Sequence, residues 1–283
     1  MGSKDHQKIV EDILHIDEGL PHASNLLRKI ILANTNQGFK KALDKIVPAY
    51  YDMNKKITAT DDLEKMVAAL NKYLEIIRSE ECKIFSHQSD FLSSVVPEFL
   101  YLIFLQIIKK NKLAYQVKSQ EDVIIDCNFD PQIENSISFE KKRVDVLLIK
   151  TAKFVFNDVE YSDFFIPVIA IEVKTNMDKN MISGIENSVE SLKRTFPRSL
   201  YFAVCEWADF AFEKQNYANT YIDEIFVLRK QRRSDFRVSG IVNKIDTQVV
   251  KHFIDRVEEH LTSLQNQTQS IKDRMRKGML IKR

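Results

Sequence analysis

Apolar positions in the first third of the chain recur at helical spacing. Between residues 63 and 77 they form a single stripe, made up of Leu63, Met66, Val67, Leu70, Leu74 and Ile77. This spacing predicts an amphipathic helix. Asp61 and Glu64 have the spacing of a capping box, with Asp in place of Ser or Thr. The segment from Asn25 to Tyr51 is also predicted to be helical, with a break near Pro48.

A second apolar segment, Phe91 to Lys112, predicts a long buried helix. Pro97 either kinks this helix or marks the first turn of a second piece. Its most apolar part, Phe99 to Ile108, is followed at once by Lys109 and Lys110. That part is shorter than the roughly 20 apolar residues needed to cross a bilayer. We therefore expect a core helix and no membrane partner.

From about residue 120 the pattern changes to short runs rich in β-branched residues. Four of these runs predict strands: Arg143–Lys150, Ile166–Lys174, Leu200–Cys205 and Glu224–Leu228. Helical spacing predicts a helix over about 178–195, between the second and third strands. The order strand, strand, helix, strand, strand predicts the α/β (α+β) class, with a mixed central sheet flanked by helices.

A last helix is predicted from about Asp246 to Leu264, with its apolar residues on one face. The tail from Lys272 onward has six basic residues and one acid, so we expect it to be frayed or docked on a partner. Three regions follow: a helical N-terminal region over 1–85, a core over 86–245, and a C-terminal helix with a basic tail over 246–283. No internal repeat is visible.

Composition adds few constraints. The 283 residues are 44% hydrophobic and 29% charged, an ordinary globular balance, and the net charge of +2 neither requires nor excludes a nucleic-acid partner. The cysteines Cys82, Cys127 and Cys205 form no CxxC pair, which argues against a zinc ribbon or a redox motif. Lone cysteines and the absence of a hydrophobic signal core suit the reducing bacterial cytoplasm.

Two charged residues end an apolar strand. Glu172 and Lys174 are two positions apart, so their side chains project to the same side of the sheet. A charge in such a strand is costly unless it is paired or bound to a cation. One interpretation is a simple ion pair near the strand end; the other is a catalytic site.

Asp145 favours the catalytic interpretation. It lies in the preceding strand between Val144 and Val146, where the flanking hydrophobes argue against a turn. If the two strands pair, Asp145 and Glu172 converge, and two close carboxylates repel unless a divalent cation lies between them. Such a site suits Mg²⁺, which polarises a phosphate and activates water. Lys174 would orient or help to deprotonate that water and stabilise charge on the phosphate.

Glu98 is a further candidate because it lies within the apolar Phe91–Ile108 segment. It could be a carboxylate supporting the site or binding a second metal ion. The alternative is a solvent-facing Glu at a helix start, where a negative charge favours the helix dipole.

The Asp…Glu-x-Lys pattern, in this order of strands and helix, resembles the PD-(D/E)XK nuclease superfamily, with Val144 where the motif has Pro. Residues 167–207 and 222–233 further resemble type II restriction endonucleases of the BbvCI kind, with a weaker echo at Lys65–Tyr73. The resemblance implies metal ligands at Asp145 and Glu172, with the Val173 backbone carbonyl completing the set, and the catalytic lysine at Lys174.

The resemblance also implies an activity and partners. Enzymes of this kind cleave double-stranded DNA at a short site, often built around CTNAG, and each active site cuts one strand. Some are built from two related but different subunits. The expected assembly is therefore a homodimer, or a heterodimer with a related subunit, bound to DNA and using Mg²⁺.

Basic residues gather in two places that could contact DNA. Cations of this type suit phosphates and guanine edges, although a basic run is often a solvated surface, and cations at a helix end are equally explained by the dipole. Lys179 stands at a helix start, where the dipole does not favour a cation. The predicted DNA contacts are Lys179, Lys193, Arg194, Arg198, Arg229, Lys230, Arg232, Arg233 and Arg237.

Other chemistries lack their motifs. The chain has no GxSxG, GxGxxG or GxxxxGK[ST] sequence, so an ATP-driven mechanism has no support. Three hypotheses remain: a site-specific restriction endonuclease, a repair nuclease or junction resolvase of the same fold, and a catalytically silent DNA-binding subunit. The intact Asp145, Glu172 and Lys174 favour the first.

Overall fold

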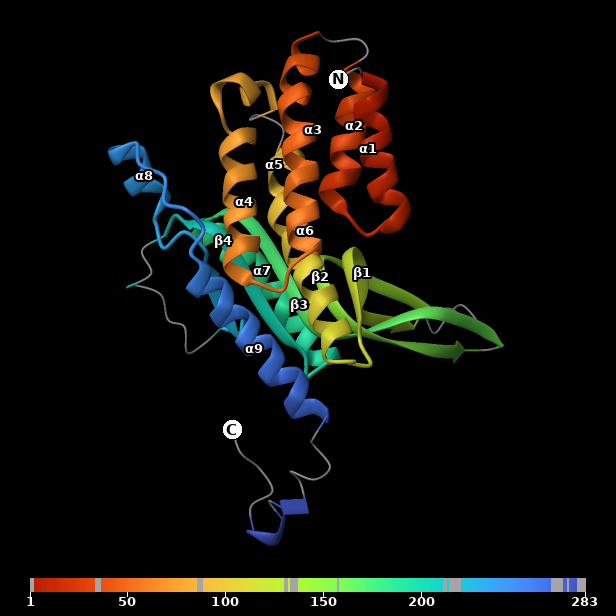
Figure 1. The fold of residues 1–283 in the computed structure, drawn as a ribbon. Helices are drawn as coiled ribbons and strands as arrows, with labels where there is room; N and C mark the ends of the chain where they lie inside the picture. Colours follow the sequence, from red (N-terminus) through yellow and green to blue (C-terminus); the bar gives the residue numbers. More distant parts are fainter. Residues whose placement is uncertain are drawn as a thin grey trace.

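The computed structural model describes residues 3–33, 37–85, 89–129, 132, 137–156, 158–210, 213, 220–265, 272–273 and 275–278. A group of helices stands against one end of a twisted sheet, and two further helices lie across the sheet's opposite faces (Figure 1). Half of the basic tail from Lys272 onward, residues 274 and 279–283, lies outside the described residues.

The N-terminal region is helical, as predicted. It comprises α1 (Ser3–Ile16), α2 (Pro21–Leu32), α3 (Gln37–Thr58), α4 (Leu63–Ile77) and a 3₁₀ turn, η1 (Glu80–Phe85). The predicted break near Pro48 is wrong, because α3 continues through this residue. Ile46, Val47, Tyr50 and Met53 are buried on both sides of Pro48, so core packing stabilises the helix across it.

The start of α4 differs from the prediction by one residue. Asp62, rather than Asp61, is the N-cap, and its carboxylate accepts hydrogen bonds from the backbone N–H groups of Glu64 and Lys65 at 3.0 and 3.3 Å. The predicted apolar stripe is confirmed, since Met66, Val67, Leu70, Leu74 and Ile77 are all buried.

The second apolar segment forms two helices. A short α5 (Ser89–Ser93) and a longer α6 (Val95–Lys110) meet at Ser94, so Pro97 lies in the first turn of the second helix. Within the described residues, Asp90–Lys110 is long and apolar enough to cross a membrane. However, 72% of its apolar window is buried inside the protein, as expected for a core helix.

The sheet has five strands in the order of the sequence. They are β1 (Gln116–Phe129), β2 (Ile137–Phe156), β3 (Val159–Met177), β4 (Leu200–Ala208) and β5 (Glu224–Val227). The first three are antiparallel, and β3, β4 and β5 are parallel. Helix α7 (Lys179–Thr195) connects β3 to β4, while α8 (Arg233–Ser239) and α9 (Thr247–Gln265) follow β5. The predicted mixed sheet of the α+β class is confirmed.

Each face of the sheet packs on a different set of helices. On β3, Ile169, Ile171 and Val173 belong to the core shared with the N-terminal helices, α6 and α9, whereas Ala170 packs into the core beneath α7. Because side chains alternate along a strand, Glu172 and Lys174 project from the α7 face. The first core runs from α1 to α9, so the helical region and the sheet bury one continuous interior.

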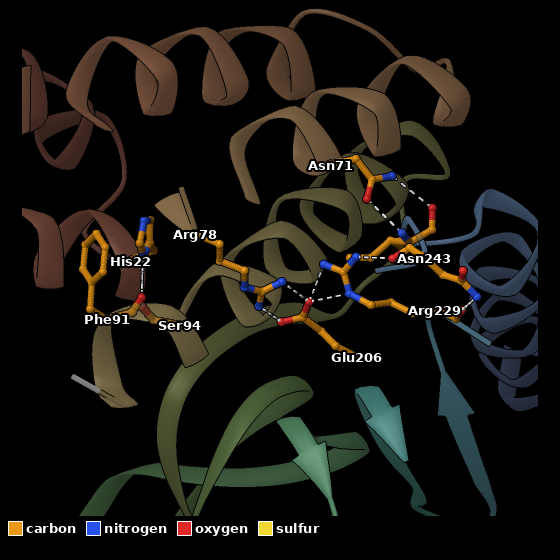
Figure 2. Close-up of polar contacts among 9 residues, drawn as sticks. His22, Asn71, Arg78, Phe91, Ser94, Glu206, Arg229 and Asn243 are labelled. Atoms are coloured by element: carbon orange, nitrogen blue, oxygen red, sulfur yellow. Dashed lines mark hydrogen bonds and ion pairs between the residues drawn. The ribbon is translucent and has the colours of Figure 1, made fainter. Parts of the chain in front are cut away.

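Buried polar contacts also join the helices to the sheet (Figure 2). Glu206 on β4 forms a bidentate ion pair with Arg78, at the end of α4, and also binds Arg229, after β5, with N···O distances of 2.7 and 2.9 Å. The side chain of Asn71 on α4 hydrogen-bonds both backbone groups of Ile245. These contacts fix α4 to β4 and to the segment before α9.

Candidate active site

Neighbouring strands bring the predicted catalytic residues together. Val146 on β2 pairs with Ile171 on β3, so the antiparallel register places Asp145 opposite Glu172. Lys174 Nζ lies 2.7 Å from Glu172 Oε1 and 4.0 Å from Asp145 Oδ2. Both carboxylates therefore converge on one ammonium group, as expected from the sequence.

The Asp145 carboxylate is held from two sides. Its Oδ2 accepts a hydrogen bond from the Val173 backbone N–H, and its Oδ1 accepts one from the Gln120 side-chain amide, both at 2.7 Å. Gln120 lies on β1, between the paired positions Ser119 and Glu121, and has a φ of +55°. A non-glycine residue with this left-handed backbone is uncommon in a strand. Sequence reasoning missed Gln120, because nothing near it in the chain marks it as a partner of Asp145.

Glu172 has its own supporting contacts. The Tyr201 hydroxyl on β4 donates to Glu172 Oε2 at 3.2 Å, and Lys142 Nζ lies 3.8 Å from the same oxygen. Burial, and then the charge of Glu172, raise the pKa of Tyr201 well above its ordinary value, so the hydroxyl stays a neutral donor. Tyr201 and Lys142 were also missed, because nothing in the sequence around them marks them as partners of Glu172.

The charged groups of the site shift one another's pKa values. Burial, and then the neighbouring charge of Glu172, raise the pKa of Asp145 above its usual value. For Lys174, burial opposes the charged form, but the two carboxylates outweigh it and raise its pKa. Lys174 lies beside both carboxylates, and Lys142 lies 3.8 Å from Glu172 Oε2, so two ammonium groups face the two carboxylates.

The donor set fits a hard cation that retains water. Within the described residues, no group of three or more His, Cys, Asp and Glu side chains could hold a metal ion. Asp145 and Glu172 supply two carboxylates, and a backbone carbonyl such as that of Val173 could supply a third oxygen. Few protein oxygens and several waters are typical of Mg²⁺ rather than of zinc or calcium.

A cavity of about 860 Å³ opens beside these residues. Asp145, Val173, Lys174, Thr175 and Asn176 form its sheet side. The opposite side comes from α2 and from the α5–α6 junction. Only 8% of the Glu172 side chain is exposed, so a substrate in the cavity would meet Asp145 and Lys174 first.

Glu98 has a different environment from the one proposed from the sequence. It is buried in α6, and its Oε2 accepts hydrogen bonds from the backbone N–H groups of His22 and Ala23 at 2.7 and 2.9 Å. Its Oε1 accepts a bond from the Tyr50 hydroxyl at 2.8 Å. Glu98 is therefore not a solvent-facing residue, and it contacts the start of α2 and Tyr50 on α3. It does not line the cavity beside Asp145.

The prediction that Arg229 contacts DNA is wrong. Only 4% of this residue is exposed, and its guanidinium binds Glu206 and the Asn243 carbonyl. The ring of Trp207 lies 4.8 Å from this guanidinium. The basic run around Arg229 predicts an exposed surface, because the buried partner of this residue, Glu206, lies 23 positions away in the sequence.

The other predicted DNA contacts differ in their surroundings. Lys193, Arg194 and Lys230 form ion pairs with Asp223, Glu190 and Asp246, respectively. Lys179 and Arg237 are exposed, and Arg233 lines the cavity beside Asp145. Arg198 and Arg232 each interact with other groups of the protein. Of the nine, Arg233 is thus the predicted contact that lines the candidate active site.

Comparison with known proteins indicates which class of protein this chain resembles. The sequence model of the Bpu10I restriction endonuclease family matches residues 146–249, a region that includes Glu172 and Lys174 and begins directly after Asp145. The solved structure of the native BbvCI A2B2 tetramer matches with a TM-score of 0.67 and 26% identity, over 88% of this chain and 97% of that chain. The chain is a type II restriction endonuclease or a subunit of one. No curated protein matches it.

For a restriction endonuclease subunit, the position of the carboxylates has a clear meaning. They lie where β2 and β3 pass beneath the helical region, beside a cavity with polar walls on both sides. The fold thus places the charged cluster where a phosphodiester backbone could enter.

Proposed function

We propose that this chain is a catalytically active, Mg²⁺-dependent DNA endonuclease that hydrolyses one strand of a defined duplex site. The convergence of Asp145 and Glu172 on Lys174 Nζ carries this proposal. Asp145, Glu172 and the Val173 carbonyl would hold the Mg²⁺ ion. When bound, the ion would polarise the scissile phosphate and lower the pKa of a bound water.

The chain's own residues perform the remaining steps. Lys174, beside both carboxylates, orients the attacking water, and its ammonium stabilises negative charge that builds on the phosphate. Water attacks phosphorus, one P–O bond of the backbone breaks, and the departing oxygen takes a proton. Gln120 and Tyr201 fix the orientations of Asp145 and Glu172 through the contacts described above.

A second subunit is part of the proposal. A duplex has two strands, and the chain carries one Asp145–Glu172–Lys174 cluster. The matching BbvCI structure is described as an A2B2 tetramer. By analogy, we expect this chain to act in the bacterial cytoplasm as a homodimer or with a related companion chain.

The test is plasmid cleavage by the purified chain, alone and with any companion chain encoded beside it, in Mg²⁺ and in EDTA. We expect discrete products that require Mg²⁺ and that sequence to a single site. Glu172→Gln and Lys174→Gln should each lower the cleavage rate by about 10²–10⁴-fold while duplex binding is retained.

The control is Lys251→Gln, which removes an exposed cation on α9 and should cleave normally. No cleavage by any combination of chains, or normal cleavage by the Glu172→Gln variant, would contradict the proposal. A smear of products without a defined cleavage site would support a nuclease that is not site-specific. Equal cutting of branched and linear DNA argues against a junction resolvase.

A further inference from the structure

Helix α2 turns a polar face toward the active-site cavity. Its residues that line the cavity are Pro21, Ser24, Asn25 and Arg28, which follow helical spacing. The other face, with His22, Ala23, Leu26 and Ile30, is buried in the helical region. The helix therefore offers hydrogen-bonding and cationic groups across the cavity from Asp145 and Lys174.

The orientation of α2 is fixed by a buried polar network. The His22 ring hydrogen-bonds the Tyr73 hydroxyl at 2.5 Å. Its other nitrogen lies 3.0 Å from the Ser94 hydroxyl and 3.1 Å from the Phe91 carbonyl, and Figure 2 shows these three residues together. Glu98 binds the first backbone N–H groups of the helix, as described above. Ser94 itself lines the cavity. The wall opposite the catalytic strands is thus positioned by contacts to α4, α5 and α6.

Three arginines reach this cavity from three different elements. They are Arg28 on α2, Arg143 on β2 and Arg233 on α8, and all three line the cavity beside Asp145. Among the described residues, none of the three has an ion-pair or side-chain hydrogen-bond partner, whereas Arg78, Arg194, Arg229 and Arg256 are all paired with carboxylates. Unpaired guanidinium groups around one cavity indicate a site for an anion.

Four carboxylates also line the cavity, and three of them have contacts other than these arginines. Asp178 is the N-cap of α7 and accepts from the Met181 backbone N–H at 2.9 Å, and Asp145 belongs to the catalytic cluster. Asp90 has an interaction of its own, and Glu18 also lines the cavity. A volume of about 860 Å³ suits a short stretch of a single backbone and is too small to enclose a duplex.

We propose that Arg28, Arg143 and Arg233 form a phosphate clamp that holds the strand being cut, on both sides of the bond opposite Asp145 and Lys174. The proposal rests on the nuclease function above and names the groups that hold its substrate. Guanidinium groups suit this role, because their donors match phosphate oxygens in a bidentate manner. Two of these residues, Arg28 and Arg143, carry no signal in the sequence that points to DNA.

The test is the salt dependence of duplex binding, measured in EDTA so that no strand is cut. The variants are Arg28→Gln, Arg143→Gln and Arg233→Gln, with Lys251→Gln as the charge-matched control outside the cavity. Each is titrated with a duplex containing the mapped cleavage site and with one whose site is scrambled. Thermal melting of each variant confirms that it is folded.

A phosphate contact has a defined signature. Each Arg→Gln variant should weaken binding to both duplexes by a similar factor and reduce the slope of log K against log salt by about 1. Arg28→Lys, which keeps the charge, should restore most of the slope, and Lys251→Gln should leave it unchanged. Unaltered slopes would overturn the proposal. So would a loss confined to the intact site, because that result would mean base reading.

This experiment separates the clamp from the catalytic proposal. The salt slopes are measured without divalent ions, so they do not depend on cleavage. Slopes that shift in a protein that never cuts DNA would support the clamp and contradict the nuclease function. Unchanged slopes in a protein that cuts normally would contradict the clamp and support the nuclease function. If no cleavage site can be mapped, a random-sequence duplex serves as the probe.

Discussion

Gln120 holds Asp145 from a third strand, in a backbone conformation that is costly for a residue with a side chain. Its φ of +55° and its 2.7 Å bond to Asp145 Oδ1 occur at the same position. Backbone strain of about 1–3 kcal/mol persists only where the surroundings enforce it, and such positions concentrate at functional sites. The coincidence of strain and contact indicates that Gln120 is a positioning residue for the candidate metal ligand.

We expect Gln120→Ala to lower the cleavage rate at limiting Mg²⁺ by about 10–100-fold, because a freely rotating Asp145 binds the ion less well. Higher Mg²⁺ should recover much of the loss, so the change would appear in the Mg²⁺ midpoint more than in the maximum rate. Gln116→Ala is the matched control, since Gln116 is an exposed glutamine on the same strand. Equal Mg²⁺ midpoints for both variants would show that Gln120 does not position the ligand.

The residues found from the sequence share one property. Asp145, Glu172 and Lys174 are charged groups within apolar strand segments. The free-energy cost of burying them can therefore be inferred from the sequence alone. Gln120 and Tyr201 are ordinary residues for their strands, and they matter only because β1 and β4 place them beside the carboxylates. Register between strands is set by the whole sheet, which a local pattern does not encode.

At the scale of elements, prediction succeeded where one face of a segment is buried. The α4 stripe, the α7 and α9 helices and four of the five strands were predicted, each from repeated apolar positions. Strand β1 was missed because Lys118, Glu121 and Asp122 interrupt its apolar pattern. This edge strand pairs only with β2 and buries few side chains, so its residues need not alternate strictly.

The start of α2 depends on two buried groups whose titrations oppose each other. Burial raises the pKa of Glu98 to about 7 and lowers the pKa of His22 to about 3. The folded protein therefore gains stability from Glu98 as pH falls from about 7 toward 4.5, the ordinary value of Glu. It loses stability from His22 as pH falls from 6.5 toward 3, because the unfolded chain takes up that proton first.

We expect Glu98→Gln to remove the Glu98 titration and expose that of His22. The Gln carbonyl can accept from the His22 and Ala23 backbone N–H groups, so the variant should fold. Its melting temperature should then fall more steeply than that of the parent protein between about pH 6.5 and 4.5. Differential scanning calorimetry across this range measures the effect, and an unchanged pH profile would contradict it.

The same variant decides between the two roles considered for Glu98. A structural cap predicts normal cleavage by Glu98→Gln at neutral pH, whereas Glu98→Ala should destabilise the fold by about 1–3 kcal/mol, because two buried N–H groups lose their acceptor. A metal ligand or catalytic acid predicts that Glu98→Gln loses cleavage while its melting temperature at neutral pH is preserved. Plasmid cleavage beside calorimetry distinguishes these outcomes.

For the whole molecule, the ion-pair network around Glu206 joins the helical region to the nuclease sheet. Burial alone would raise the pKa of Glu206, but Arg78 and Arg229 outweigh it and hold the pKa below its usual value. Its contribution to stability is therefore present above about pH 4.5 and is lost as pH falls below that value. The cavity beside Asp145 also has walls from both regions.

We expect Glu206→Gln to lower the unfolding free energy by about 3–5 kcal/mol, because two guanidinium groups remain close together without their carboxylate. The matched control is Glu75→Gln on α4, whose exposed ion pair with Lys244 should contribute less than about 1 kcal/mol. Denaturant unfolding at pH 7 measures both. Similar losses of unfolding free energy for the two variants would mean that the buried network stabilises the protein no more than an exposed ion pair does.

The last prediction concerns how a chain with one active site cuts two strands. If each chain cuts one strand, an assembly with one inactive chain should stop at the nicked plasmid. We therefore expect an equal mixture of the parent chain with its Glu172→Gln variant to accumulate open circles, as should the variant combined with an intact companion chain. The pure Glu172→Gln protein without a companion should leave the plasmid supercoiled, and Lys251→Gln in the same mixture should give linear DNA. Linear product at the parental rate from the mixed assemblies, with no cleavage by the pure variant, would mean that one site cuts both strands in turn.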